Sequence, residues 1–365
     1  MAGLFSIPLK QHNSFCRADG RRIPFGNLCK SFEQEVKLDN QKGMQLKRDN
    51  QPTFFDMAMQ QRGAANKVLE TIARVVDFSA AEERVAATYG SGGRPACRVG
   101  VLLRIMILQH LYGLSDPQVE EQIRDRLSFQ KFVQLDTAET VPDETTICRF
   151  RQRLIQSGLH ESLLGLLNQQ LEARGYIVKT TTIVDATIIE SSRKRPDVEA
   201  ARNGTAPDAD ASYTRKYGCS YYGYKAHVSS DGEHQMIRSA LLRTAKVQDG
   251  HVFTAVVPAQ SQSVYADKIY DLNSVRAWLA ERGIANGILK KGAHHIKLST
   301  QDHENNRRKS RVRTNIERIF AHLKQWQNYR RVRYLGLVKN QLELTLKAVA
   351  YNLKRMAKIL EQQNA

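Results

Sequence analysis

The segment from Val178 to Ile189 constrains the fold of this chain more than any other. It is rich in Val, Ile and Thr, whose β-branched side chains favour an extended strand. One carboxylate, Asp185, interrupts this apolar run. Because an unpaired buried carboxylate is costly, Asp185 must be paired, bound to a metal or exposed at the end of the strand. The ordinary alternative is a surface Asp where the strand meets the edge of the sheet.

The residues that follow predict a mixed α/β sheet. A polar loop over residues 191–220 precedes two strands joined at Asp231-Gly232, after which helices alternate with strands. The expected strands are 221–228, 236–244, 263–266 and 287–289, and the expected helices are 251–257 and 272–281. Asp267 closes the strand over residues 263–266, and functional residues often collect at such strand ends in α/β sheets.

Helical periodicity precedes this sheet, over residues 54–158. A buried helix is expected over residues 99–111, and Ser115-Asp116-Pro117 predicts the start of the next one. Asp143 caps a later helix whose apolar stripe leaves three arginines on other faces: Arg149, Arg151 and Arg153. Short helices joined by tight turns are typical of a helix-turn-helix-like DNA-binding region, and equally of an ordinary helical bundle.

The last third of the chain is helical again. Apolar residues recur at intervals of three and four over residues 306–329, which predicts one amphipathic helix, and a final helix is expected over 340–360. The expected organisation is a flexible basic extension (1–52), a helix-turn-helix-like helical region (53–158), an α/β catalytic domain (176–329) and a basic C-terminal helix (330–365).

The charge balance favours a polyanionic partner. The chain has 55 Lys and Arg against 37 Asp and Glu, a net charge of +18, and residues 301–365 alone hold 15 of these cations against 5 acids. A concentrated basic surface is the footprint of a protein that binds the phosphate backbone of nucleic acid. Charge alone is also compatible with a generically soluble basic protein.

Cysteine usage and hydropathy predict a cytoplasmic protein without a membrane segment. The five cysteines are odd in number and none forms a closely spaced pair, which argues against a disulfide framework and a structural zinc site. The start of the chain shows no secretory signal, and the most apolar stretch, residues 99–111, is too short to span a bilayer.

Three carboxylates could carry chemistry together. Asp185 and Asp267 lie at strand ends, and Glu317 lies on the helix of residues 306–329. Each has an ordinary reading by itself; Glu317, for example, could form an i, i+4 ion pair with Arg313. Converging carboxylate oxygens would suit Mg²⁺, and two such ions could clamp an in-line displacement at phosphorus. Arg313 and Lys324, which share a helix face with Glu317, would then bind phosphates.

Several ordered motifs resemble the DDE transposases of small bacterial insertion sequences, in the InsH-like group. Thr182-Ile183-Val184-Asp185-Ala186-Thr187 resembles the strand of the first Asp, and Val264-Tyr265-Ala266-Asp267-Lys268-Ile269-Tyr270 resembles the second-Asp motif. Arg313, Glu317 and Lys324 match a Tyr-Arg-Glu-Lys type signature in which Ser310 replaces the Tyr. Further matching segments are 142–151, 222–227, 333–337 and 350–355. The resemblance spans residues 51–361.

This resemblance implies an RNase H-like mixed sheet, preceded by a helical DNA-binding region and followed by C-terminal helices. It implies catalysis by Asp185, Asp267 and Glu317 with two Mg²⁺ ions, for which Mn²⁺ could substitute. The implied partners are double-stranded DNA, as terminal inverted repeats and target, and further copies of the chain in a dimer or higher assembly. The implied location is the bacterial cytoplasm, at the nucleoid.

Two other functions compete with this one. An RNase H-like nuclease would use the same three carboxylates, and would cut DNA without joining strands. A domesticated, inactive relative would only bind DNA, and would have no need of Asp185, Asp267 and Glu317. His227 and His251 are expected to be structural or surface residues, because the proposed ions prefer oxygen.

Overall fold

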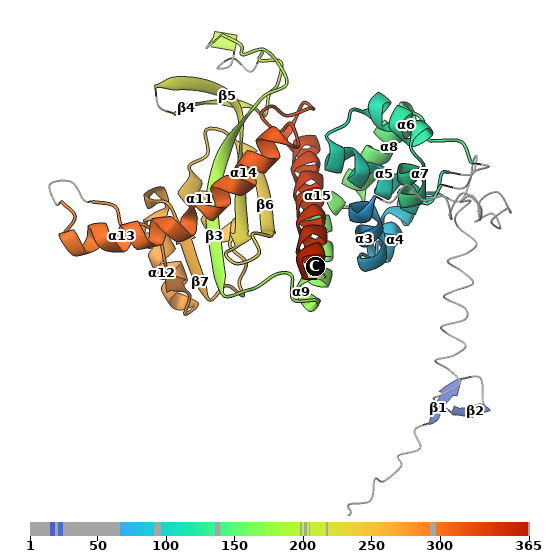
Figure 1. Ribbon diagram of the computed structural model, residues 1–365, viewed down its shortest axis with the longest axis horizontal. Helices are drawn as coiled ribbons and strands as arrows, with labels where there is room; N and C mark the ends of the chain where they lie inside the picture. The colour runs from blue at the N-terminus through green and yellow to red at the C-terminus, as the bar shows by residue number, and fades with distance from the viewer. Residues whose placement is uncertain are drawn as a thin grey trace, which may run out of the picture. The chain divides into compact units, whose positions relative to one another are not determined.

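The fold is taken from a computed structural model of the chain (Figure 1). It describes residues 66–90, 96–135, 139–197, 199–200, 203, 205–216, 218–292 and 297–363, and the backbone of 15–18 and 21–24. The chain divides into two compact units, residues 1–47 with 89–96 and residues 48–88 with 97–365. The first contains an antiparallel hairpin of β1 (Phe15–Ala18) and β2 (Arg21–Pro24), which the sequence did not predict. The rest of the extension expected over residues 1–52 lies outside the described residues.

The helical part of the second unit is built around one buried helix. α5 (Val99–Tyr112) is buried over nearly its whole length and ends at Gly113, whose φ of 68° provides the left-handed stop. The expected cap is confirmed at α6 (Asp116–Asp125), where Ser115 and Gln118 form a capping box, and at α8 (Glu144–Gln156), where Asp143 accepts the N–H of Thr146. The other helices of this part are α3 (Lys67–Val75), α4 (Ser79–Ala86), α7 (Leu127–Val133) and α9 (Leu159–Ala173).

Arg151 of α8 was expected on a face of its helix away from the apolar stripe. It is instead buried, with only 4 % of its surface exposed. Its guanidinium donates to Asp116 at 2.6 Å and lies 4.7 Å from the ring centre of Tyr334. An arginine held by a carboxylate and an aromatic ring joins helices together. Arg151 therefore stabilises the helical part and is not available to read a DNA groove.

The sheet combines parallel and antiparallel strands, as expected. β3 (Thr181–Glu190) lies at its centre, antiparallel to β5 (Cys219–Asp231) and parallel to β7 (Ser263–Ala266), which pairs with β8 (Ala285–Asn286). The outer edge of β5 pairs first with β4 (Ser212–Lys216) and then with β6 (Ile237–Thr244). The central order β6-β5-β3-β7-β8 is the RNase H-like mixed sheet, so this expectation is confirmed.

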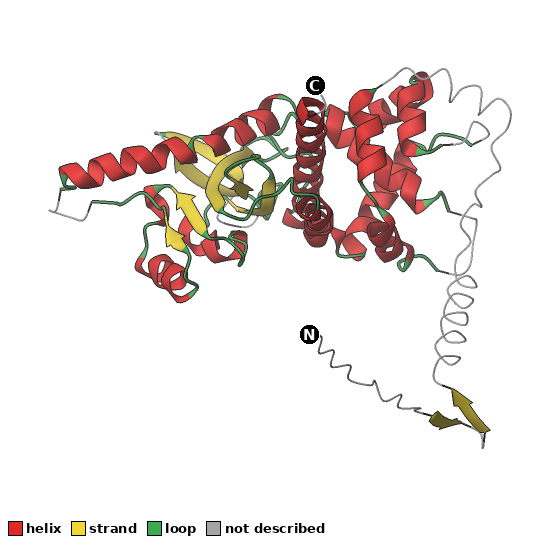
Figure 2. Ribbon diagram, turned by 60° about the horizontal axis from the view of Figure 1, so that its bottom comes forward, coloured by secondary structure: helices red, strands yellow, loops and turns green. Residues whose placement is uncertain are grey.

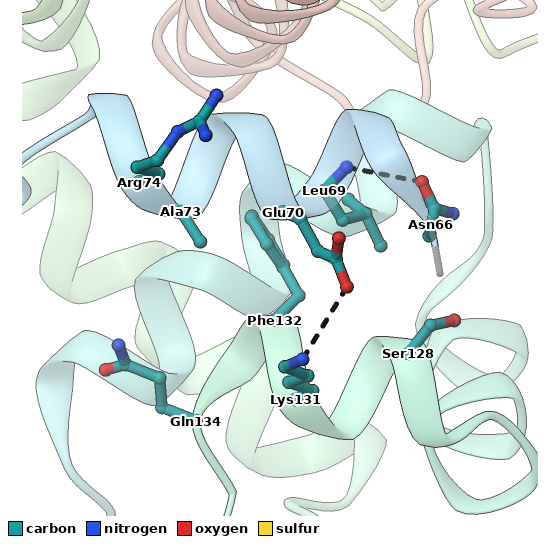
Figure 3. Close-up of a pocket in the computed structure, with 9 residues that line it drawn as sticks. All are labelled: Asn66, Leu69, Glu70, Ala73, Arg74, Ser128, Lys131, Phe132 and Gln134. Atoms are coloured by element: carbon teal, nitrogen blue, oxygen red, sulfur yellow. Dashed lines mark hydrogen bonds and ion pairs between the residues drawn. The ribbon is translucent and has the colours of Figure 1, made fainter. Parts of the chain in front are cut away.

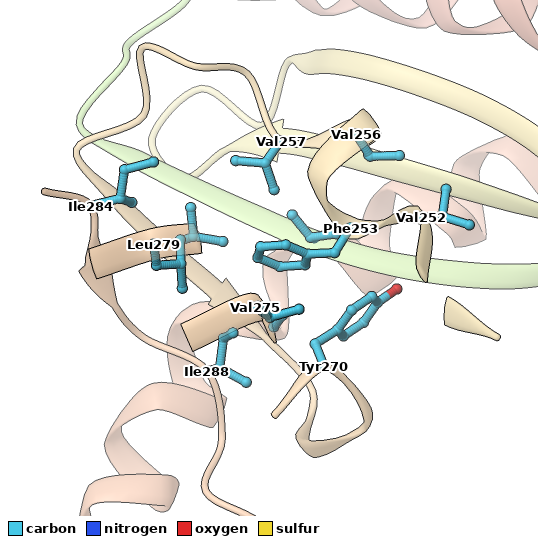
Figure 4. Close-up of a cluster of buried hydrophobic side chains, with 12 residues drawn as sticks. Val252, Phe253, Val256, Val257, Tyr270, Val275, Leu279, Ile284 and Ile288 are labelled. Atoms are coloured by element: carbon cyan, nitrogen blue, oxygen red, sulfur yellow. The ribbon is translucent and has the colours of Figure 1, made fainter. Parts of the chain in front are cut away.

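Helices cover the two faces of the sheet (Figure 2). On one face, α11 (Asp249–Val256) and α12 (Asn273–Glu281) bury an apolar cluster against Val184, Val264 and Ala266 of the central strands (Figure 4). α14 (Asn315–Gln325) contacts β3, and in Figures 1 and 2 it lies on the opposite side of the sheet from α11 and α12. Because side chains alternate along a strand, burial of Val184 in the cluster turns Asp185 towards the other face.

The free edge of β6 is covered by α15 (Leu337–Gln363). Gln341 accepts the N–H of Leu242 at 2.7 Å, and Asn352 accepts that of Ile237 at 2.8 Å. The two side-chain amides are three helical turns apart, so they lie on the same face of α15 and both contact β6. They satisfy backbone groups that an edge strand would otherwise leave unpaired.

α15 carries part of its basic charge inside the fold. Lys347 and Glu343 are both buried on it, with 3.5 Å between their charged atoms, and Lys347 also donates to the carbonyl of Gln327. Part of the basic charge of the last 65 residues is thus internal. No helix in the described ranges is long and apolar enough to span a membrane.

The single helix expected over residues 306–329 is two helices. α13 (Thr300–Arg313) and α14 are separated at Thr314, whose hydroxyl donates to the carbonyl of Ser310 at 3.0 Å. Such back-bonding to residue i−4 bends helices. Two smaller differences are that β4 falls within the loop expected over 191–220, and that β8 lies two residues before the expected strand.

Candidate active site

Asp185 is placed by β3 in the middle of the sheet, on the face opposite the apolar cluster. Its side chain is 21 % exposed, and its Oδ1 accepts the N–H of Ala186 at 2.8 Å. Asp185 is therefore a half-buried carboxylate in the central strand, and not a surface Asp at the sheet edge.

Asp267 follows β7 directly, where the 3-10 helix η1 (Lys268–Tyr270) begins. β3 and β7 are parallel, with Val184 opposite Ala266, so Asp185 and Asp267 are the next residues along two neighbouring strands. Adjacent strands lie about 4.8 Å apart. The Oδ1 of Asp267 accepts the N–H of Lys268 at 2.7 Å, which fixes the carboxylate at this strand end.

Arg313 links the third carboxylate to the first. Its Nη1 lies 2.9 Å from Oδ2 of Asp185, and its Nη2 lies 3.0 Å from Oε1 of Glu317. The Nε–H of Arg313 is buried and has no hydrogen-bond partner among the described residues. Glu317 is 54 % exposed, in the first turn of α14. The break at Thr314 thus falls between Arg313, which contacts Asp185, and Glu317, which contacts Arg313.

The charges around Asp185 favour the binding of a cation. Burial raises the pKa of its carboxyl to about 6, and the negative charge of Asp267 adds to this rise. The N–H of Ala186 and the charges of Arg313 and Lys216 act in the opposite direction. Two neighbouring carboxylates, one of them desolvated, repel each other unless a cation lies between them.

The donor set fits a hard divalent cation, although the three carboxylates do not close around one point. Carboxylate oxygens at neighbouring strand ends are the ligands that Mg²⁺ prefers. No group of three metal-ligating side chains is assembled within the described ranges, because the guanidinium of Arg313 lies between Asp185 and Glu317. The residues available to hold an ion are therefore Asp185 and Asp267, with Glu317 turned towards Arg313.

Lys324 lies further along α14, seven residues after Glu317. Burial lowers the pKa of its amine, as do the charges of Lys216 and Arg330, while Glu190 opposes the shift. Glu190 is the last residue of β3, and its N–H donates to the carbonyl of Arg330 at 3.0 Å. Lys324 therefore lies towards the C-terminal end of β3, in a group of cations beyond the carboxylates.

Lys216 was not among the residues predicted from the sequence. It lies on β4, and its charge acts on both Asp185 and Lys324. The signal that could have revealed it is the run Ser212-Tyr213-Thr214 before Gly218, which has strand-forming residues followed by a turn residue.

The histidines and tyrosines near the site are structural. His227 is buried on β5 opposite Ala186, and burial lowers its pKa to about 4. Tyr222 and Tyr224 are buried and donate to Asp208 at 2.6 and 2.7 Å, so they are not surfaces for base stacking.

A separate pocket of about 500 Å³ lies between α3 and α7 (Figure 3). Its acidic residue, Glu70, forms an ion pair with Lys131 at 3.6 Å, and apolar residues such as Leu69 and Phe132 line the rest. This pocket offers no second cluster of carboxylates.

Two family models and a solved structure match parts of this chain. A family model described as "Transposase domain (DUF772)" matches residues 57–153, and one described as "Transposase DDE domain" matches residues 177–353. Together they span most of the chain, and the second contains every carboxylate of the site. A solved structure described as a piggyBac transposase synaptic complex with hairpin DNA aligns over 86 % of this chain and 79 % of that one, with 6 % identity and a TM-score of 0.38.

Proposed function

The chain belongs to the DDE transposases of insertion sequences, which cleave and transfer DNA, and we propose that Asp185, Asp267 and Glu317 are its catalytic residues. The observation that carries this proposal is the pairing of β3 with β7, which sets Asp185 beside Asp267 while Arg313 ties Glu317 to Asp185. The proposed substrates are the terminal inverted repeats of the element and a target duplex.

The proposed cofactor is a pair of Mg²⁺ ions, with Mn²⁺ as a substitute. Asp185 and Asp267 would hold them, joined by Glu317 once it leaves Arg313. When bound, divalent ions lower the pKa of the attacking water or 3′ hydroxyl and offset charge on the leaving oxygen.

The residues of the chain bind and orient the strand that is cut. Arg313 has a planar guanidinium, and its two Nη groups, once released from Asp185 and Glu317, would suit two oxygens of one phosphate. Lys324, half-buried among other cations, would hold a second phosphate as a point charge. The two side chains lie on either side of Glu317 in the chain, so they would align the strand along α14.

The proposed organisation keeps the regions expected from the sequence, with one change of role. Residues 53–158 would bind the repeats, 176–329 would carry out catalysis, and 330–365 would stabilise the sheet through α15. Two ends must meet one target, so a dimer or higher assembly on DNA is proposed, at the nucleoid of a bacterial cytoplasm.

The test is cleavage of DNA taken from the flanks of the protein's own gene, in Mg²⁺. Wild-type protein should nick at the flank boundaries and join the ends to a second duplex. Asp185→Ala and Asp267→Asn should abolish both reactions and retain DNA binding, whereas Glu361→Ala, an exposed carboxylate near the end of α15, should behave as wild type.

Three outcomes would contradict the proposal. Cleavage by either site variant would remove that residue from the catalytic site. Free ends without joined product would indicate a nuclease. Binding by the wild-type protein without any cleavage would indicate an inactive relative that only holds DNA.

A further inference from the structure

α13 is attached to the rest of the fold through polar contacts, although none of its residues is buried. Asp302 accepts from Nζ of Lys290 at 2.9 Å, and Asn306 exchanges hydrogen bonds with the backbone of Lys290 at 2.9 and 3.0 Å. Further along the helix, Lys309 donates to the carbonyl of Ile288 at 3.0 Å. The helix is therefore fixed beside the segment that follows β8, and Figure 1 shows it extending away from the sheet.

These contacts all come from one side of α13, the inner face. The inner face consists of Asp302, Asn306, Lys309 and Arg313. At about 100° per residue, these four positions lie within roughly 60° of one another around the helix axis. Arg313 contacts Asp185 at 2.9 Å, so the inner face is turned towards the carboxylates of the site.

The opposite side of α13, the outer face, carries three arginines and one acid. These exposed residues are Glu304, Arg307, Arg308 and Arg311. Helical spacing centres them about 180° from the inner face, so they point away from Asp185. Glu304 forms an ion pair with Arg308. Arg307 and Arg311 have no hydrogen-bond or ion-pair partner in the part of the chain that the structure describes.

Two unpaired arginines one helical turn apart weaken the helix that carries them. Like charges at positions i and i+4 repel each other, and the remaining acid of α13, Asp302, is engaged by Lys290 on the inner face. A polyanion would offset this repulsion, and each arginine would release counterions when it binds a phosphate. Because Arg307 and Arg311 are about 6 Å apart along the helix axis, both can reach the backbone of one duplex.

A duplex on the outer face is a different duplex from the one that is cut. A helix with its side chains is about 10–12 Å across, so a strand held at Asp185 is separated from Arg307 and Arg311 by the whole width of α13. Joining needs a second duplex close to the carboxylates, and the outer face lies one helix width from them. Because contacts to the phosphate backbone carry no sequence information, this face suits the target duplex better than a terminal repeat that must be recognised.

We propose that the outer face of α13 binds the phosphate backbone of the target duplex through Arg307 and Arg311. The inference rests on the proposed function, because it requires that one strand is cut at Asp185 and joined to a second duplex. It assigns the two DNA molecules to the two sides of α13. The cut end lies on the side of Arg313, and the target lies on the side of Arg307 and Arg311.

The test is the binding of a second duplex by the protein in complex with flank DNA that ends at the boundary, measured in EDTA so that no strand is cut. The second duplex is labelled and has an unrelated sequence. Loss of one phosphate contact lowers the slope of log Kd against log salt by about 0.9, so Arg307→Gln/Arg311→Gln should lower the slope for the second duplex by about 1.8. The slope for the flank DNA itself and the rate of nicking in Mg²⁺ should stay at the wild-type values.

Two further double variants control for charge and for folding. Arg307→Lys/Arg311→Lys keeps both charges and should keep the wild-type slope for the second duplex. Arg282→Gln/Lys358→Gln removes the same charge from exposed positions just after α12 and on α15, and should also keep that slope. The melting temperature of every variant should match that of the wild type, because all four side chains are exposed.

The outcomes separate this inference from the proposed function. An unchanged slope for the second duplex in Arg307→Gln/Arg311→Gln, an equal loss in Arg282→Gln/Lys358→Gln, or no second duplex bound by the wild-type complex would overturn the inference. A lower slope for the flank DNA would assign the outer face to the end that is cut, and would overturn its assignment to the target. Cleavage that survives in Asp185→Ala would overturn the catalytic proposal, and would leave the result with the second duplex standing, because that binding is measured without cleavage.

Discussion

Replacing Arg313 by Gln should strengthen the binding of divalent metal while it weakens catalysis. Arg313 occupies Asp185 and Glu317 at 2.9 and 3.0 Å, so a metal ion must displace it before both carboxylates can act as ligands. Its own charge also repels an incoming cation. Arg313→Gln removes the competitor and leaves Asp185 beside Asp267 with less positive charge around it.

The magnitude follows from the exposure of the three side chains. Asp185 and Arg313 are 21 % and 18 % exposed, so their contact is worth about 1.5 kcal/mol, the lower end for a hydrogen bond to a charged group. The contact with Glu317, which is 54 % exposed, adds only about 0.3 kcal/mol. Removing both should lower the Kd for metal by about twentyfold.

Calorimetric titration of the DNA-free protein with Mg²⁺ measures this effect directly. The matched control is Arg311→Gln, an exposed arginine two residues earlier on α13, which should keep the wild-type Kd. Cleavage of flank DNA by Arg313→Gln should fall at the same time, because the proposed phosphate contact is lost. An unchanged Kd would show that Arg313 does not compete with the metal, and a weaker Kd would show that it helps to assemble the ligands; either result would refute the reasoning.

Three further predictions concern the charged or titratable side chains of Lys324, Glu343 and His110. Lys324→Ala should weaken DNA binding and lower its salt slope by about one, and an unchanged slope would place Lys324 off the DNA. Glu343→Gln should cost about 3 kcal/mol in urea denaturation because it leaves buried Lys347 without its carboxylate, and a loss under about 1 kcal/mol would count against a structural ion pair. The pKa of buried His110 is held well below its usual range by burial and then by the charges of Lys347 and Arg333. Below about pH 6.5 the unfolded chain binds a proton at His110 and the native chain does not, so the free energy of unfolding decreases by about 1.4 kcal/mol for each unit by which the pH is lowered. His110→Gln should remove this part of the acid sensitivity. Identical pH profiles of stability for the variant and the wild type would refute this prediction.

Local rules explain what the sequence predicted well. The cap at Ser115 and the cap at Asp143 depend on residues three positions apart, and both form as expected. The β-branched run around Asp185 becomes a central strand because both its apolar faces find helices to cover them. Such features depend on only a few neighbouring residues, so they can be predicted from the sequence without knowledge of the fold.

Long-range contacts explain what the sequence did not reveal. The residues of β4 look like part of a polar loop because their partners, on β5, lie after the turn. The division between α13 and α14 falls at Thr314, whose hydroxyl bonds to the carbonyl of residue i−4, and the continuous apolar pattern does not reveal it. From the sequence alone, Arg151 resembles a surface charge. In the fold its guanidinium contacts Asp116, 35 residues before it, and Tyr334, 183 residues after it.

The candidate site divides in the same way. The pattern of Arg313 and Glu317 correctly suggested an i, i+4 ion pair, which is a local interaction. Nothing in the spacing of Asp185 and Asp267, 82 residues apart, shows that they follow paired positions of two parallel strands. Their convergence was predicted through the family resemblance, and the register of β3 and β7 supplies the physical reason.

The distribution of cations bears on where DNA can lie. The excess of basic residues after position 300 suggested a continuous basic tail, yet several of its members have internal partners. Lys347 is buried against Glu343, Arg333 donates to the carbonyl of Leu114, and Arg355 donates to the carbonyl of His234. A charge already paired inside the protein releases no counterions when DNA binds, so it adds nothing to the salt slope. Near the carboxylates, the cations proposed to hold the backbone are Lys324 and its neighbour Arg330. The DNA path should therefore follow α14, rather than the C-terminal helix.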